Sequence, residues 1–293
     1  MSEIDLHIHT CYSADGEFKP ADIIKLASKK QLEAVAITDH DTVEGLEEAI
    51  KAGREYNIEV VPGIEFDTEF QKENLHILGY YLDWEAPELD EVTEQIRNSQ
   101  YQQAKARVKL LQEMGFKLSW QAVEKEAAII PVGGIIAKVL LNNGLNEDDE
   151  RLIPYLDGKR SGQPYFNFYL DYFLPGKPAY IKNELPDARE VIELIHSLGG
   201  VAVLAHPGSA ISLDENEEIL YKLIERGLDG LEAYSTYHSP KEVIKFTTWA
   251  KEEGVLITAG SDFHGKLKPE VKLGGVDGND YQLLTRLKGR ANR

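Results

Sequence analysis

Side chains that can bind metal ions occur within the first fifteen residues of the chain. His7 and His9 alternate along a short predicted strand, and Asp15 lies in the loop that follows. Alternation along a strand turns both imidazoles to the same face. Two adjacent imidazoles with a carboxylate nearby can hold a divalent cation. This segment therefore predicts one side of a metal site.

Residues of the same chemistry recur along the chain. They stand at the starts or ends of short apolar runs or in the loops that follow, and they are His40, Glu65, His76, His206, Asp262 and His264. A single histidine in such a place is more often an ordinary core or loop residue than a metal ligand. For the whole set to be ordinary residues, their similar placement would have to arise by chance many times. Nine imidazoles and carboxylates exceed the needs of one ion, so we expect two or three divalent ions. Nitrogen and oxygen ligands without thiolates suit Mn²⁺, Fe²⁺ or Zn²⁺.

The elements that must position these residues alternate between apolar strands and amphipathic helices. Strands are predicted at 32–37, 58–61, 75–82, 201–205, 228–234 and 255–259, and helices at 20–30, 42–56, 186–198, 213–226 and 240–253. Pro62 and Gly63 are expected to end the third strand, just before Glu65. The alternation predicts parallel βα units and an α/β barrel. Because the loops after parallel strands meet at one face, the candidate ligands should meet there too.

Residues 84–179 interrupt this pattern. Helices are predicted at 87–114, 119–128 and 135–141, followed by an aromatic-rich segment at 165–173. No Gly/Ser/Pro-rich tether marks either edge, so a helical insertion over the barrel mouth is favoured over a separate domain. The barrel would then comprise 1–83 and 180–293, with 84–179 as a substrate cap.

Composition narrows the range of partners. The 293-residue chain is 42% hydrophobic, as is usual for a globular protein, and its formal net charge is −18. That charge opposes broad attraction to nucleic acid or anionic membranes. The single cysteine, Cys11, excludes an internal disulfide and fits a reducing compartment. With no apolar run long enough for a secretory signal or a membrane span, we expect a cytoplasmic protein without a membrane partner.

Five short motifs resemble, in order, those of the PHP (polymerase and histidinol phosphatase) family. They read His7-Ile-His9-Thr10, Thr38-Asp39-His40, Pro62-Gly63-Ile64-Glu65, Ala205-His206-Pro207 and Gly260-Ser261-Asp262-Phe263-His264. The segment from His76 to Tyr80, together with the helical insertion, is similar to the branch of small nucleotide phosphoesterases. The resemblance extends from residue 4 to about residue 275. It implies a distorted seven-stranded (β/α) barrel that holds three ions.

The resemblance also implies how the ligands are grouped. By motif position, His7, His9, Glu65 and Asp262 would hold the first ion, Asp15, His40 and His264 the second, and Glu65, His76 and His206 the third. Glu65 would thus be the bridge. Asp5 and Asp41 would orient imidazoles from outside, although Asp41 could equally cap a helix.

The expected chemistry is hydrolysis of a phosphoester. Bound ions would attract a phosphate into this acidic protein and lower the pKa of a shared water to near ~7, so that hydroxide attacks phosphorus. Asp15, His40, Glu65, His206 and Asp262 would act through that hydroxide. The predicted substrate is a small phosphorylated metabolite, a nucleoside monophosphate or 3',5'-bisphosphate. Alternatives are a 5'-3' exonuclease acting on short oligonucleotides, a histidinol-phosphate-type phosphatase and a non-catalytic metal-bound module.

Four residues are candidates for substrate contacts. Arg107, Lys138 and Lys177 lie in the insertion and His238 follows a barrel strand, but a solvated helix face or loop is the alternative for Arg107 and His238. Related phosphatases usually carry an Arg-Pro-His segment just before the helix that contains Lys138, and its arginine helps to hold the phosphate. Here the segment from Val132 to Ile135 has neither that arginine nor that histidine.

Overall fold

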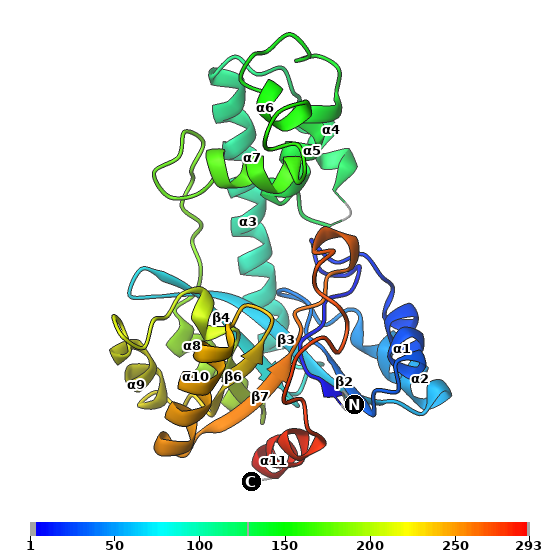
Figure 1. Cartoon of the computed structure of the whole chain (residues 1–293), viewed down its shortest axis with the longest axis vertical. Coiled ribbons are helices and arrows are strands. Elements are labelled where there is room, and N and C mark those ends of the chain that lie inside the picture. The colour runs from blue at the N-terminus through cyan, green and yellow to red at the C-terminus, as the bar shows by residue number, and fades with distance from the viewer. Residues whose placement is uncertain (1–3, 128, 292–293) are drawn as a thin grey trace. The chain divides into compact units, whose positions relative to one another are not determined.

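A computed structural model describes residues 4–127 and 129–291 of the chain (Figure 1). The chain forms two compact units. One consists of Met1–Thr93 with Leu185–Arg293, and the other is Glu94–Glu184. The ends of the predicted barrel ranges, residues 1–3 and 292–293, lie outside the described residues, as does residue 128, where one predicted helix was expected to end.

Among the described residues, the first unit contains a seven-stranded sheet. Its strands follow one another in chain order: β1 Ile4–Asp5, β2 Ala34–Ile37, β3 Glu59–Phe70, β4 Glu73–Tyr80, β5 Val201–Leu204, β6 Gly230–Ser235 and β7 Leu256–Gly260. The first and last strands approach each other, because the Leu6 N–H donates to the Ala259 carbonyl at 2.9 Å and Ile8 pairs with Phe263. The predicted distorted seven-stranded barrel is confirmed.

The strand β4 departs from the predicted parallel pattern. It runs antiparallel to both β3 and β5, whereas the other neighbouring strands are parallel. Gln71 and Lys72 join β3 to β4 as a two-residue turn with positive φ at both positions, the geometry of a tight hairpin. The prediction of parallel units throughout was therefore wrong for this strand.

Pro62 and Gly63 do not end β3, contrary to the prediction. Pro62 stays in register with Ile37, and the strand continues to Phe70. A Cβ atom at Gly63 would lie 2.9 Å from the Thr38 methyl group, so glycine permits close packing inside a continuous strand. Glu65 is consequently a mid-strand residue.

Helices surround the barrel, and Figure 1 shows α1 and α2 on one flank and α8, α9 and α10 on another. The helices of this unit are α1 Pro20–Lys29, α2 Leu46–Tyr56, α8 Ala188–Ser197, α9 Glu218–Ile224, α10 Pro240–Glu253 and α11 Tyr281–Ala291, with 3-10 turns η1 Pro207–Ser209 and η2 Gly265–Leu267. Pro20 begins α1 as predicted, since proline at the first helical position loses no hydrogen bond. The helix α2 begins later than predicted, so Asp41 is not its cap.

The second unit is helical. It contains the greater part of α3 Pro87–Glu113, followed by α4 Trp120–Glu126, α5 Gly133–Asn142, α6 Ile153–Leu156 and α7 Pro164–Tyr172. Ser119 caps α4 by accepting the Ala122 N–H. The ring of Phe168 is fully buried and stacks on Tyr172 at 4.1 Å, so at least part of the aromatic segment forms core. No helix in the described part of the chain is long and apolar enough to cross a membrane.

Candidate metal centre

The nine predicted ligands converge inside the barrel unit. They come from β3 and β4 and from the segments that follow β1, β2, β5 and β7. Their ligand atoms form overlapping groups within 4.8 Å: His7, His9, Glu65 and Asp262; His9, Asp15, His40 and His264; Glu65, His76 and His206; and His40, Asp67 and His76. Three of these groups contain the sets implied by the family resemblance. The fourth contains Asp67, which the sequence analysis missed.

Glu65 is the centre of this arrangement. One carboxylate oxygen, Oε2, lies 2.9 Å from His7 Nε2 and 3.0 Å from His9 Nε2. The other, Oε1, lies 2.9 Å from His76 Nδ1 and 3.1 Å from His206 Nε2. Burial opposes ionisation of this fully buried group, but the surrounding imidazoles, foremost that of His7, bring the pKa of Glu65 well below its usual value. Glu65 is therefore an ionised carboxylate whose two oxygens face different groups of ligands.

Asp262 divides its oxygens in a similar way. Its Oδ1 lies 3.0 Å from His9 Nε2 and 3.4 Å from His7 Nε2. Its Oδ2 lies 2.6 Å from Lys268 Nζ and accepts a hydrogen bond from the Tyr237 hydroxyl at 2.8 Å. Burial raises the pKa of Asp262, but the imidazoles of His7 and His264 lower it by a larger amount. The pKa of Asp262 therefore lies well below its usual value.

Asp15, His40 and His264 lie beside His9. The His264 ring stacks on His9 with centroids 4.0 Å apart, and its Nε2 lies 3.1 Å from Asp15 Oδ2. His40 Nε2 lies 4.0 Å from the same oxygen. Burial and the two neighbouring imidazoles, His264 before His40, lower the pKa of His9 to about 4. His9 is therefore neutral at physiological pH, as a metal ligand must be.

Contacts outside the cluster fix the orientation of most of the rings. The Nδ1 atoms face away from the centre and meet partners as follows: His7 with Glu232 Oε1 at 3.1 Å, His9 with Ser13 Oγ at 3.3 Å, His206 with Ser209 Oγ at 3.0 Å and His264 with the Asp262 carbonyl at 2.7 Å. These four rings direct Nε2 to the cluster. His76 is reversed, because its Nδ1 faces Glu65 and its Nε2 lies 3.4 Å from Asp67.

Two carboxylates of the site escaped the sequence analysis as functional residues. Asp67 follows Glu65 by two positions on β3, so strand alternation places it on the same face, but the expected strand end at Gly63 hid that signal. Its Oδ1 lies 3.2 Å from His40 Nδ1. Glu232 lies in the apolar strand β6 and is fully buried. A buried carboxylate requires a polar partner, which was the signal available for this residue.

The two acidic residues expected to orient imidazoles both accept hydrogen bonds from backbone N–H groups. Asp5 accepts the Ser261 N–H at 2.8 Å and its hydroxyl at 2.6 Å, which holds the segment that carries Asp262. Burial raises the pKa of Asp5 to about 6. Asp41 accepts the Asp67 N–H at 3.1 Å. Non-glycine residues with positive φ occur here at Asp41, His206 and Asp262, as is common where function constrains the backbone.

The four residues predicted to contact the substrate differ in their surroundings. His238 donates from Nδ1 to the Ala233 carbonyl and accepts the Gly208 N–H at Nε2, both at 2.9 Å, so neither nitrogen is left for a substrate. Arg107, Lys138 and Lys177 belong to the second unit. Arg107 is 8% exposed and lies over the ring of Phe173 rather than on a solvated helix face. Lys138 pairs with Glu126 at 2.6 Å, and Lys177 is exposed.

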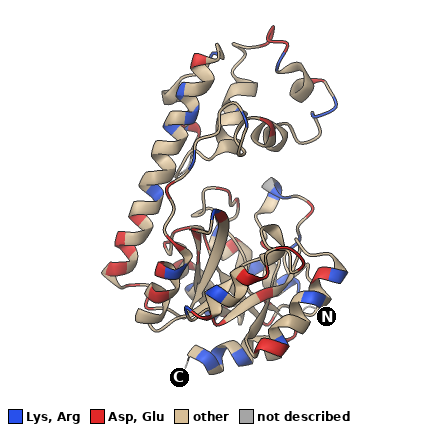
Figure 2. Ribbon diagram, turned by 90° about the vertical axis from the view of Figure 1, so that its left-hand side faces the viewer, with Lys and Arg blue, Asp and Glu red and all other residues tan. Residues whose placement is uncertain are grey.

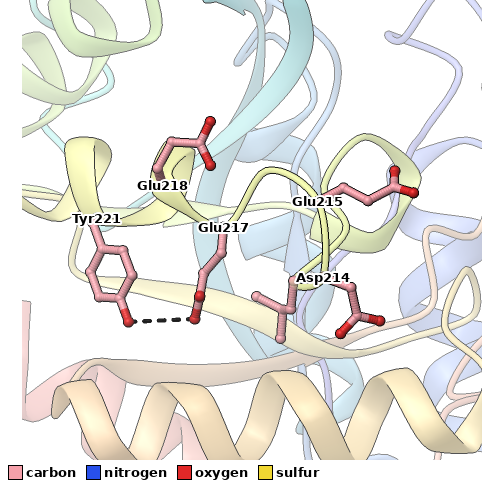
Figure 3. A pocket seen from close by; sticks show the side chains of 6 residues that line it. Asp214, Glu215, Glu217, Glu218 and Tyr221 are labelled. Carbon is pink, nitrogen blue, oxygen red and sulfur yellow. Dashed lines mark hydrogen bonds between the residues drawn. The ribbon is translucent and has the colours of Figure 1, made fainter.

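A separate hollow of about 280 Å³ lies beside the start of α9 (Figure 3). It is lined by Leu213, Asp214, Glu215, Glu217, Glu218 and Tyr221, and none of these is a candidate ligand. Tyr221 donates to Glu217 at 3.4 Å, and Asp214 pairs with Lys245. Its acidic lining opposes phosphate binding.

The cluster fits divalent cations. Nε2 of His7 lies 3.1 Å from Nε2 of His9, although two ring nitrogens of this kind can share at most one proton. His40 Nδ1 and His264 Nε2 are buried, and each faces a carboxylate oxygen, that of Asp67 at 3.2 Å and that of Asp15 at 3.1 Å. Buried carboxylates and imidazoles that converge in this way need positive charge between them.

Comparison with known proteins agrees with the fold. The model of the PHP domain matches residues 5–173. A 5'-3' exoribonuclease of Haemophilus influenzae is 30% identical over 266 residues, which cover 89% of each chain. A 3',5'-nucleoside bisphosphate phosphatase of Chromobacterium violaceum is 27% identical over 272 residues, covering 90% of this chain and 88% of that one.

A solved structure shares the complete fold. It is a candidate metal-dependent phosphoesterase of Bifidobacterium adolescentis, with a TM-score of 0.79 and 28% identity, and the match covers 99% of this chain and 96% of that one. The chain belongs to the PHP-domain family. It is an enzyme of the metal-dependent phosphoesterase class, as the sequence motifs predicted.

Proposed function

We propose that the enzyme hydrolyses a phosphomonoester of a small nucleotide, either a nucleoside monophosphate or a 3',5'-bisphosphate. The observation that carries the proposal is the position of Glu65, whose two oxygens face two different groups of imidazoles. This is the arrangement expected of a carboxylate shared between cations. The printed name of the Chromobacterium violaceum relative, a nucleoside bisphosphate phosphatase, supports the substrate class.

Three groups of residues would hold the ions, and we propose Mn²⁺, Fe²⁺ or Zn²⁺ as occupants. The first group is His7, His9, Glu65 and Asp262, the second is Asp15, His40 and His264, and the third is Glu65, His76 and His206. When bound, such ions activate water for attack and offset the negative charge of a phosphoryl group. The protein contributes the fixed ring orientations set by Glu232, Ser13 and Ser209.

Charge favours a small substrate over a long polymer. The chain carries a formal net charge of −18, and Figure 2 shows acidic and basic residues interspersed along both units. A protein that follows a nucleic-acid backbone over many nucleotides needs a continuous basic groove. We retain the helical unit as a proposed substrate cap, with Arg107, Lys138 and Lys177 as its candidate phosphate contacts.

A second candidate is 5'-3' trimming of short oligonucleotides. It is favoured by the name of the Haemophilus influenzae relative, which matches almost the whole chain. A short oligonucleotide carries few phosphates, so the acidic surface opposes its binding less than that of a long polymer.

One set of assays separates these candidates. The protein is stripped with a chelator, reloaded separately with Mn²⁺, Fe²⁺ or Zn²⁺, and given AMP, adenosine 3',5'-bisphosphate, histidinol phosphate and a 5'-phosphorylated RNA tetramer. We expect release of inorganic phosphate from one of the adenosine nucleotides, with the highest kcat/KM of the four substrates and no activity in the stripped protein. Preferred release of mononucleotides from the tetramer would support the second candidate, and undiminished activity after stripping would refute both.

A further inference from the structure

One lysine of the barrel unit contacts the carboxylate cluster directly. Lys268 Nζ lies 2.6 Å from Asp262 Oδ2 and 2.7 Å from the Tyr237 hydroxyl. The Tyr237 hydroxyl donates to the same Asp262 oxygen at 2.8 Å, and its ring packs against His206 at 4.8 Å. The ammonium is thus fixed at the edge of the candidate metal centre by contacts on two sides.

These contacts leave the ammonium able to bind a further group. Asp262 turns Oδ1 toward the ligand imidazoles and Oδ2 toward Lys268, so filling the ligand groups does not require Lys268 to leave. An ammonium has three N–H donors, and two are directed to Asp262 and Tyr237. The Lys268 side chain is 30% exposed, so the third donor can reach a molecule that enters from solvent.

Several other candidate phosphate-binding side chains in the chain are absent, already paired or buried, which draws attention to the cation at position 268. The segment from Val132 to Ile135 contains no arginine, lysine or histidine that could bind a phosphate. Lys138 is already paired with Glu126, and Arg107 is buried over Phe173. Lys268, in contrast, touches a candidate ligand within the same compact unit.

We propose that Lys268 donates its third N–H to a non-bridging oxygen of the substrate's phosphoryl group, and that Tyr237 is the positioning residue that holds it there. Lysine is a common phosphate-binding residue because it provides a compact positive charge. The lysine stays protonated and no bond to it forms or breaks. The inference rests on the proposed phosphoesterase function and assigns a substrate contact to the barrel itself. A phosphomonoester, with its additional negative charge, should depend on this contact more than a diester does.

The test compares Lys268→Met with Lys266→Met. Lys266 lies two residues earlier, is 86% exposed and pairs with Glu17 at 2.6 Å, so its removal deletes the same charge without touching Asp262. Metal content per chain, binding of inorganic phosphate by calorimetry, and kcat/KM for p-nitrophenyl phosphate and bis(p-nitrophenyl) phosphate are measured on metal-loaded protein. For Lys268→Met we expect unchanged metal content and phosphate binding weakened by roughly tenfold to hundredfold, the range for a charged hydrogen bond.

The monoester-to-diester ratio distinguishes a substrate contact from a supporting role. We expect Lys268→Met to lower kcat/KM for the monoester at least tenfold more than for the diester, whereas Lys266→Met changes neither by more than about twofold. Tyr237→Phe should act in the same direction with a smaller effect, and Lys268→Arg should recover part of the phosphate binding. Equal losses for both esters, or lost metal with normal phosphate affinity in the remaining loaded protein, would overturn the proposal. If the wild-type enzyme hydrolysed neither these esters nor the two adenosine nucleotides, the proposed function would fail, but phosphate calorimetry would still decide the role of Lys268.

Discussion

Nε2 of His7 lies 3.1 Å from Nε2 of His9, and both nitrogens face Oε2 of Glu65 within 3.0 Å. Two lone-pair-bearing nitrogens and a carboxylate oxygen repel one another unless a proton or a cation lies between them. The pKa of His9, lowered to about 4 chiefly by burial, disfavours the proton. Although burial opposes it, the carboxylates of Glu65 and Glu232 raise the pKa of His7 well above its usual value, so either a proton on His7 or a divalent cation supplies the positive charge.

Metal removal should destabilise the barrel unit. An ion at a free concentration of 100 times its Kd stabilises the folded chain by about 2.7 kcal/mol per site. We expect a lower Tm in scanning calorimetry after chelation and full recovery with Mn²⁺ or Zn²⁺. Glu65→Gln should lower the number of ions bound and remove most of this response. An identical Tm with and without ions would contradict the metal centre.

Asp67 should strengthen metal binding through two imidazoles. Its Oδ1 lies 3.2 Å from His40 Nδ1 and 3.4 Å from His76 Nε2. We expect Asp67→Asn to weaken metal affinity by roughly 10- to 100-fold, as is usual when a carboxylate behind a ligand histidine is lost. Competition with a fluorescent chelator measures this affinity. Glu47→Gln, which removes an exposed carboxylate from α2, is the charge-matched control and should leave the affinity unchanged.

Gly260 should be required for the His7–Glu232 pair. A Cβ atom at this position would lie 2.2 Å from His7 Cβ and 2.3 Å from Glu232 Oε1, so both side chains would have to move. We expect Gly260→Ala to lower the free energy of unfolding by about 1–3 kcal/mol and to reduce metal content. Gly289→Ala is the control, because its Cβ meets nothing within 4 Å in α11 and should stabilise the helix by about 0.5–1 kcal/mol. Urea unfolding of both variants distinguishes the steric clash at Gly260 from a general effect of replacing glycine with alanine.

His238 should make stability depend on pH. Burial lowers the pKa of His238 below its usual 6.5. In the folded chain its neutral Nε2 accepts the Gly208 N–H. The unfolded chain then binds the proton more readily than the folded chain, so this contribution to stability is complete above pH 6.5 and is lost as the pH falls through the lower, folded pKa. We expect His238→Gln to show a shallower fall in unfolding free energy than the wild type between about pH 7.5 and 5.5. Parallel curves for the two proteins would exclude this role.

Local sequence patterns predicted much of the fold. Proline at the first position of α1 and the serine cap of α4 mark helix starts by rules that involve only neighbouring residues. The hairpin of β3 and β4 was missed, because Pro62 and Gly63 usually interrupt strands. Close packing of Gly63 against Thr38 explains the glycine, and that neighbour comes from another strand.

The candidate ligands were predictable because an imidazole or carboxylate buried beside an apolar strand needs a polar partner or a metal ion. Their convergence is now observed, and their binding of ions stays a prediction. Asp67 was accessible from strand alternation alone. Lys268 was not, because nothing in its own segment indicates a partner such as Tyr237, which is 31 residues distant in sequence.

The sequence by itself determined which residue types were available for chemistry. It also placed most of them at strand ends, because hydrophobic periodicity and secondary-structure propensity depend on only a few neighbouring residues. Only the tertiary structure decided which oxygen of Glu65 or Asp262 faces which ring, and which cation stands at the edge of the cluster. Those relationships join β3, β4 and the segments after β1, β5 and β7, which lie far apart along the chain. Barrel closure brings the paired atoms to distances of 2.6–2.9 Å, at which charge and hydrogen bonding act strongly.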